Sequence, residues 1–156
     1  MSETTAYHEA GHAWMAHYCG ARIRFVTIEP DRDDGPDRFG EVQVEWAAGR
    51  FSERDLLNKS ILVALAGPVA EAIHRGEPLH PGFVPEWTAD WQEAWQAAAS
   101  LVPDLPNRLQ YLEQATSELY RLLNRDDQWA GLATIVDHLL AHGTLETDVL
   151  DEILPS

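Results

Sequence analysis

The chain has 156 residues, of which 45% are hydrophobic and 24% are charged, and its formal net charge is −15. These values fit one globular domain over residues 1–156 and are not typical of a disordered chain. The acid excess and the lack of a basic patch argue against binding to nucleic acid or to anionic lipid.

The first third of the chain predicts a helix followed by a small sheet. Residues 4–19 have a helical pattern that ends at Gly20. Segments 22–28 and 41–46 are β-branched and alternate at least in part, which indicates two antiparallel strands. The Asp- and Pro-rich segment 30–38 between them is expected to be a loop. A further short strand is expected, but its position is open.

The rest of the chain predicts helices. Residues 52–75 have a helical pattern, and Pro68 inside it must kink or divide the helix. Residues 76–89 contain three prolines and two glycines, and irregular segments of this length are usually functional or disordered. Four later helices are expected over residues 90–102, 107–124, 128–141 and 147–154. The fold class is therefore α+β, mostly α, with a small antiparallel sheet and a C-terminal helical bundle.

The first helix contains an HExxH motif, His8-Glu9-Ala10-Gly11-His12. Residues four apart share a helix face, so His8 and His12 can direct both imidazoles at one metal ion. Glu9 lies beside them, where its carboxylate can take a proton from a water that zinc activates. Two ordinary, partly buried histidines are the competing interpretation. Gly11 is easier to explain if another backbone or a metal ligand approaches closely.

A catalytic zinc site needs a third protein ligand and keeps one position for water. The downstream candidates are Glu71, His74, His80, Asp90, His138 and His142. Asp90 lies where the irregular segment meets the next helix, and helix N-capping is its competing role. Glu71 lies in an otherwise apolar helix, so its burial requires a cation, a metal or a metal-ligating histidine. Position and spacing rank the two carboxylates about equally.

Several segments resemble the peptidase domain of FtsH-type ATP-dependent zinc proteases. The similar segments, in the same order, are residues 7–13 (YHEAGHA), 65–71 (LAGPVAE), 88–90 (TAD) and 139–154. The resemblance covers nearly the whole chain. It implies that Asp90 is the third zinc ligand, because in that family the ligand is an aspartate far downstream at the start of a helix. It also implies a supporting role for Glu71.

The chain departs from that family at three points. Seven residues precede His8, whereas FtsH-type proteins carry membrane helices and an ATPase module before the peptidase domain. Pro68 stands where the family usually has arginine, and residues 85–90 replace its Thr-Gly-Ala-x-x-Asp segment. Unfolding of substrates by this chain alone is therefore not expected. Homo-oligomer formation and a separate ATPase partner are both left open.

These features predict a zinc-dependent endopeptidase that hydrolyses peptide bonds of unfolded proteins or peptides through a metal-activated water. Zn²⁺ is expected as the cofactor, with His8, His12 and Asp90 as ligands, Glu9 as the catalytic residue and Glu71 in support. The alternative is a non-catalytic zinc-binding scaffold or adaptor derived from such a peptidase. A helical protein that binds no metal is a third, weaker alternative.

The chain shows no targeting or membrane signal. Its first residues lack the basic start and apolar core of a secretory signal. The apolar run from Ile61 is broken at Gly67 and Pro68, which predicts that it does not span a membrane. Cys19 is the only cysteine, so an internal disulfide and a zinc–thiolate cluster are excluded. We expect a cytoplasmic protein without a membrane segment.

Two other patterns have both a structural and a functional interpretation. Trp87, Trp91 and Trp95 recur every four residues, which favours a stripe that faces the core over the wall of a substrate pocket or a subunit contact. The strand over residues 41–46 is expected either to be an ordinary hairpin strand or to pair with an extended peptide.

Overall fold

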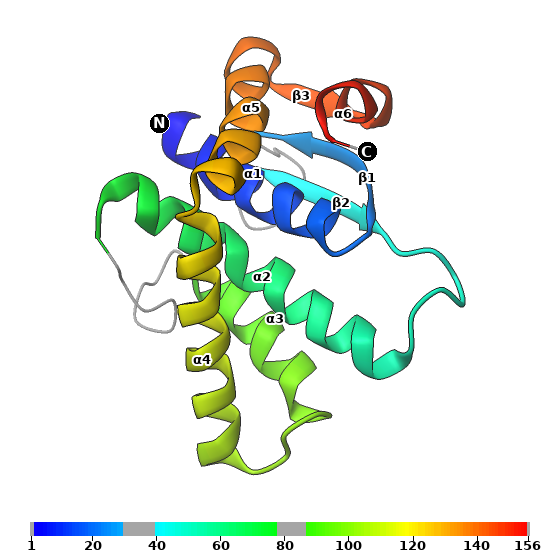
Figure 1. Ribbon diagram of the computed structural model, residues 1–156, viewed down its shortest axis with the longest axis vertical. Coiled ribbons are helices and arrows are strands. Elements are labelled where there is room, and N and C mark those ends of the chain that lie inside the picture. Colours follow the sequence, from blue (N-terminus) through cyan, green and yellow to red (C-terminus); the bar gives the residue numbers. More distant parts are fainter. Residues whose placement is uncertain (1, 30–39, 78–86, 156) are drawn as a thin grey trace, which may run out of the picture.

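The computed structural model describes residues 2–29, 40–77 and 87–155. The fold is α+β and mostly helical, as the sequence predicts (Figure 1). Its elements are α1 (Ser2–Tyr18), β1 (Arg22–Thr27), β2 (Glu41–Glu45), α2 (Glu53–Arg75), α3 (Thr88–Ala99), α4 (Leu105–Leu123), α5 (Asp126–His142), β3 (Thr144–Glu146) and α6 (Thr147–Ile153). The expected loop at 30–38 and the candidate ligand His80 lie outside the described residues.

The sheet has three antiparallel strands in the order β2-β1-β3. The third strand, which the sequence predicts without locating it, is the three-residue segment between α5 and α6. It is held by side chains as well as by its backbone, since the Thr27 and Thr144 hydroxyls are 2.7 Å apart. Thr147 does not cap α6, because its hydroxyl donates to the carbonyls of Ile23 and Arg24. Within the described chain, β2 is an edge strand.

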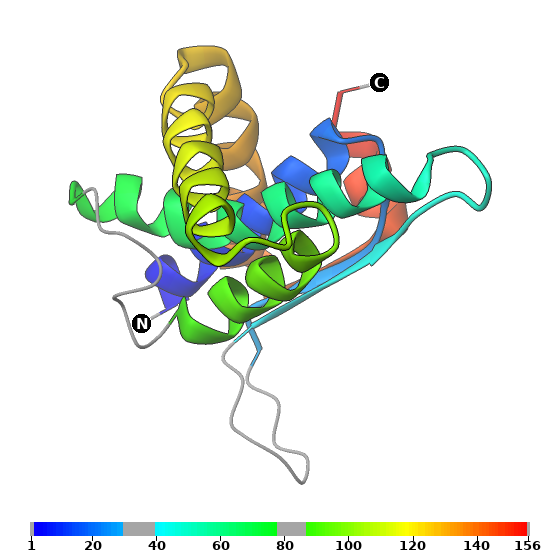
Figure 2. The same ribbon diagram turned by 90° about the horizontal axis from the view of Figure 1, so that it is seen from below.

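Helix α1 is the central element of the fold. Figures 1 and 2 show it between the sheet and α2, and α3 and α4 pack on α2. The face of α1 that meets its neighbours carries small buried side chains, Ala6, Ala10 and Ala13. Small side chains let helix axes approach closely, so the polar residues of α1 lie near the backbone of α2.

The contact between α1 and α2 is tightest at Gly11. A Cβ atom at this position would lie 2.5 Å from the carbonyl oxygen of Ala66 and 2.6 Å from the Cβ of Ala70. Real Cβ atoms do not approach other heavy atoms so closely. The sequence-based expectation that another backbone approaches Gly11 is therefore confirmed.

Helix α2 is continuous through Pro68. It begins at the N-cap Ser52, whose hydroxyl accepts a hydrogen bond from Asp55 N, and ends at Gly76, which has a φ of 77°. A proline inside a helix costs about 3 kcal/mol. The burial of residues 64–72 on all sides offsets that cost. Division of the helix at Pro68, one of the two expected outcomes, does not occur.

Among the described residues, α2 is the one helix that is long and apolar enough to cross a membrane by length and composition. Of its most apolar 18-residue window, 56% is buried inside the protein. The core helix of a soluble protein meets the same criterion, so the evidence for a membrane segment is weak. The lack of a membrane segment stays a prediction.

Helix α3 begins at Thr88, two residues earlier than predicted, so Asp90 lies in its first turn. The N-cap position is held by Trp87, which makes no side-chain capping bond. Trp87 is fully buried, and Trp91 and Trp95 pack against the core. The core-facing interpretation of the tryptophan stripe is therefore confirmed, and the N-cap interpretation of Asp90 is wrong.

Helix α4 also begins earlier than predicted. Pro106 was expected to precede it, but it lies in the first turn, where a missing backbone N–H breaks no helical hydrogen bond. Asp104 caps the helix by accepting a hydrogen bond from Asn107 N at 3.2 Å.

Replacement of Gly11 by alanine tests the close packing of α1 on α2. In an exposed helix the change would stabilise the protein by about 1 kcal/mol. Here the added methyl group must displace the Ala66 carbonyl, so we expect a loss of about 1–3 kcal/mol in the free energy of unfolding, measured by urea denaturation. The control is Ser117→Ala, an exposed site in α4, which should change the free energy by less than about 0.5 kcal/mol. Equal or greater stability of Gly11→Ala would contradict the packing argument.

Candidate metal centre

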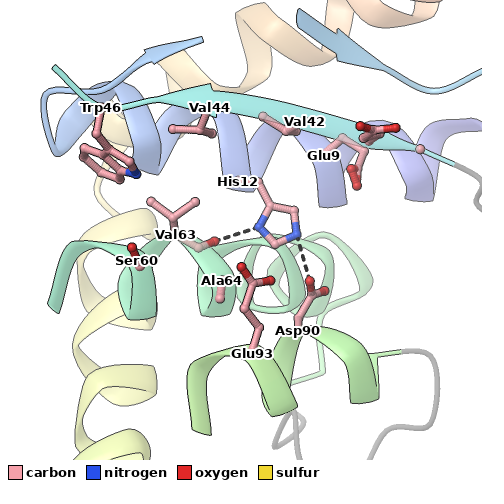
Figure 3. Close-up of a pocket in the computed structure, with 12 residues that line it drawn as sticks. Glu9, His12, Val42, Val44, Trp46, Ser60, Val63, Ala64, Asp90 and Glu93 are labelled. Carbon is pink, nitrogen blue, oxygen red and sulfur yellow. Dashed lines mark hydrogen bonds and ion pairs between the residues drawn. The ribbon is translucent and has the colours of Figure 1, made fainter. Parts of the chain in front are cut away.

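Three potential ligand atoms converge between α1 and α3. The Nε2 atoms of His8 and His12 are 3.2 Å apart. Asp90 meets both, since its Oδ2 is 2.9 Å from Nε2 of His8. Its Oδ1 is 3.4 Å from Nε2 of His12 (Figure 3). In the described part of the chain this is the one group of three or more His, Cys, Asp or Glu residues that could hold a metal ion.

The spacing of these atoms suits a tetrahedral metal. Metal–nitrogen and metal–oxygen distances of about 2.0–2.2 Å place neighbouring ligands of a tetrahedral site about 3.3–3.5 Å apart. The two Nε2 atoms, 3.2 Å apart, are close to this range, and each has an oxygen of the Asp90 carboxylate within 3.4 Å. The group His8, His12 and Asp90 therefore fits a metal ion both in donor chemistry and in size.

The imidazole of His12 is oriented by α2. Its Nδ1–H donates a hydrogen bond of 2.7 Å to the carbonyl oxygen of Val63 (Figure 3), which turns Nε2 toward the ligand group. Gly67 provides the room, because a Cβ there would lie 2.3 Å from that Nε2. Neither Val63 nor Gly67 was predicted to belong to the site, although a glycine inside an apolar helix signals a close approach.

The imidazole of His8 is oriented by Glu71, one turn further along α2. Its Nδ1 lies 3.2 Å from Oε1 of Glu71, while Oε2 of the same carboxylate accepts a hydrogen bond of 3.2 Å from Arg75. Glu71 therefore lies behind His8 and outside the ligand group. Of the two carboxylates that the sequence left as candidates, Asp90 is the one that lies near both Nε2 atoms, and the ligand assignment stays a prediction.

The other described candidates lie outside the group. His74 stacks on Tyr7 with ring centroids 4.0 Å apart, and its Nε2 is 3.5 Å from a carboxylate oxygen of Glu3. His138 and His142 are close to each other on α5, with ring centroids 6.3 Å apart. None of the three belongs to the group that could hold a metal ion.

Burial and neighbouring charges shift the pKa values of His8 and Asp90 in opposite directions. Burial lowers the pKa of His8, but hydrogen bonds to Asp90 and Glu71 outweigh it and raise the pKa to about 10. Burial raises the pKa of Asp90, but the two imidazoles outweigh it and hold that pKa well below its usual range. Without a metal ion, the centre is thus a buried ion-pair network.

Glu9 is the polar group of this site that lacks a partner. Its side chain is only 6% exposed, and its Oε2 atom has no hydrogen-bond partner among the described residues. Burial raises the pKa of Glu9, although His12 and His8 act in the opposite direction. Gly40 packs directly on it, since a Cβ there would lie 2.6 Å from Cγ of Glu9.

A cavity of about 440 Å³ opens beside the centre. Strand β2 forms one wall, and α2 and α3 form the opposite side (Figure 3). Its lining residues are Glu9, His12, Gly40, Glu41, Val42, Val44, Trp46, Ser60, Val63, Ala64, Asp90 and Glu93. The cavity has the size of a small-ligand or peptide pocket, and both Glu9 and the group around Asp90 face it.

Comparison with known proteins adds no family to this description, since no protein-family model matches the chain and no curated protein matches its sequence. The resemblance to FtsH-type peptidases therefore rests on the motifs and their order.

Metal binding by the three residues is tested by titration with a divalent ion. We expect one ion per chain, and loss of binding for Asp90→Ala. Glu71→Gln should weaken binding by about 10- to 100-fold, because it loosens the orientation of His8 without removing a ligand. Glu118→Gln on α4 is the matched control and should bind as the wild type does. Unchanged affinity of Asp90→Ala, measured by calorimetry, would exclude this set of ligands.

The raised pKa of His8 predicts how the metal-free protein responds to pH. Because the folded pKa of about 10 exceeds the ordinary value of 6.5, the stabilisation is fully present below pH 6.5 and is lost as the pH rises toward 10. In chelator, the free energy of unfolding should fall by up to about 4 kcal/mol between pH 6.5 and 9.5. The same measurement on His8→Gln should show a much smaller fall. If the free energy of unfolding fell equally in both proteins, this pH dependence could not be assigned to His8.

Proposed function

We propose that the protein is a zinc-dependent endopeptidase that resembles FtsH-type peptidases and acts on unfolded proteins or peptides. The observation that carries this proposal is the convergence of His8, His12 and Asp90 next to the buried carboxylate of Glu9, with His12, Asp90 and Glu9 lining one cavity. A purely structural helix has no need of an unpartnered buried carboxylate beside such a group.

Zinc is the metal that the donor set favours. Two imidazole nitrogens and one carboxylate oxygen in near-tetrahedral spacing are typical ligands of catalytic zinc sites, which keep the fourth position open. The cavity is lined by His12 and Asp90, which supports an open position on that side. When bound, zinc would supply Lewis acidity toward a peptide carbonyl and a water molecule.

Glu9 supplies the proton transfer. Its carboxylate would accept a proton from the attacking water and later donate it to the nitrogen of the departing amine, so that the residue ends the cycle as it began. A buried carboxylate with a raised pKa suits both roles, because it holds a proton more readily at neutral pH than an exposed one. Asp90, Glu71 and Val63 keep the imidazoles in place during these steps.

The shape of the site favours extended chains as substrates. The cavity of about 440 Å³ holds only a few side chains, and β2, an edge strand of the described sheet, borders it. An extended peptide can align its backbone with such an edge, whereas a folded protein cannot present one. A separate ATPase partner that supplies unfolded chains, or a homo-oligomer, is part of this proposal through the family resemblance.

Glu9→Gln tests the proposed reaction. The variant keeps the size of the side chain and cannot accept a proton, so we expect zinc content to be retained and the cleavage of casein to fall by at least about 10²-fold. Zinc content and casein cleavage should be measured side by side for the wild type, Glu9→Gln and Asp90→Ala.

The same measurements distinguish the peptidase from the alternative, a non-catalytic zinc-binding scaffold. If the protein is a zinc-binding scaffold, the wild type should cleave no unfolded polypeptide, and Glu9→Gln should leave both casein cleavage and zinc content unchanged. Asp90→Ala should still lower the zinc content or the stability. A zinc-loaded, folded wild-type protein without hydrolytic activity would overturn the peptidase proposal.

A further inference from the structure

The cavity beside the metal centre has two chemically different sides. The apolar part of the lining comes from β2 and α2, through Val42, Val44, Trp46, Val63 and Ala64. Strand β2 also contributes Glu41, whose carboxylate accepts a hydrogen bond from Gln43. The other side is formed by α3 and carries the carboxylates of Asp90 and Glu93 (Figure 3). Of these two carboxylates, Asp90 is occupied by the histidines, so Glu93 is the one left for another partner.

Glu93 is placed to contact a ligand near the metal centre. It lies three residues after Asp90 on α3, and residues with this spacing are neighbours on one helix face, about 5–6 Å apart. Figure 3 shows its side chain directed from α3 into the space below His12. In the part of the chain that the structure describes, no lysine or arginine lines the cavity. The charge of Glu93 is therefore not neutralised from within the pocket.

A second observation points to a ligand in the same cavity. Oε2 of Glu9 is buried without a hydrogen-bond partner among the described residues, and the side chain of this residue is 94% removed from solvent. Buried carboxylate oxygens are normally paired, because an unmet hydrogen bond in a protein interior costs free energy. Of the four carboxylates that line the cavity, Glu9 thus has a buried oxygen without a partner among the described residues, and the exposed Glu93 is open to a cationic one.

We infer that the cleft binds peptides with a lysine or arginine side chain one or two residues from the bond to be cleaved, and that Glu93 holds the cation. This inference rests on the proposed peptidase function and adds a substrate class to it. Successive residues of an extended chain advance about 3.3 Å, so a side chain one or two positions from the metal reaches Glu93. The apolar wall of Val44 and Trp46 suits the aliphatic part of such a side chain.

The net charge of the protein also favours basic peptides. With a net charge of −15, the protein attracts basic peptides and repels acidic ones over a distance set by the ionic strength. A long-range effect of this kind does not depend on one residue. The contact of the substrate cation with Glu93 depends on that one residue. Mutation of Glu93 therefore separates this contact from the effect of the net charge.

The test uses quenched fluorescent peptides that differ at one position next to the cleaved bond. This position carries lysine, norleucine or glutamate. Each flanking position is varied in turn on the zinc-loaded full chain. We expect kcat/KM to be about tenfold higher for lysine than for norleucine and about 100-fold higher than for glutamate, with smaller ratios at high salt. Glu93→Lys should reverse the order of the lysine and glutamate peptides.

Glu152→Lys is the matched control, because it makes the same change in net charge at an exposed position of α6 outside the cavity. It should lower the preference for lysine slightly and keep the order. An order that is the same in the wild type, Glu93→Lys and Glu152→Lys would overturn the inference, even if every peptide is cleaved.

Binding of the same peptides to zinc-loaded Glu9→Gln, measured by fluorescence polarisation, separates this inference from the proposed function. If no peptide is cleaved but lysine peptides bind more tightly and lose that advantage in Glu9→Gln/Glu93→Lys, the peptidase proposal fails and the binding preference is supported. If neither cleavage nor binding depends on the charge of residue 93, the inference fails.

Discussion

The close packing of α1 against α2 is the constraint on which the site depends. Gly11 admits the backbone of α2, and the two histidines of α1 then face a row of α2 residues spaced four apart, Val63, Gly67 and Glu71. Residues with this spacing form one stripe on a helix. The stripe supplies a carbonyl to His12, space for its ring and a carboxylate to His8. One helix–helix contact therefore orients both imidazoles.

The same contact makes the polar cluster tolerable in the interior. Burial of a single imidazolium or carboxylate is unfavourable, but here each charged group meets another, from Arg75 through Glu71 and His8 to Asp90. Glu9 stands apart, because it is buried beside the cluster with one oxygen unpartnered among the described residues. The cost in stability is consistent with the catalytic role proposed for Glu9.

The edge strand and α3 give the centre its surroundings. Because β2 borders the cavity on one side and α3 on the other, a bound chain would lie between the mainly apolar side chains of β2 and the carboxylates of α3. Two residues three positions apart on α3 then have different tasks. Asp90 is turned to the histidines, and Glu93 is turned to the cavity.

The HExxH motif, the helical character of most of the chain and the two longer strands were readable from the sequence, because helix and strand periodicity and the i, i+4 spacing are local properties. Proximity across the chain was not readable. From the residues alone, Asp90 and Glu71 were equal candidates, and only the packing of α3 and α2 around α1 placed one with both Nε2 atoms and the other behind His8. The roles of Val63, Gly67 and Gly40 and the three-residue strand β3 also came from tertiary contacts, since a carbonyl, a missing side chain or three residues carry almost no local pattern.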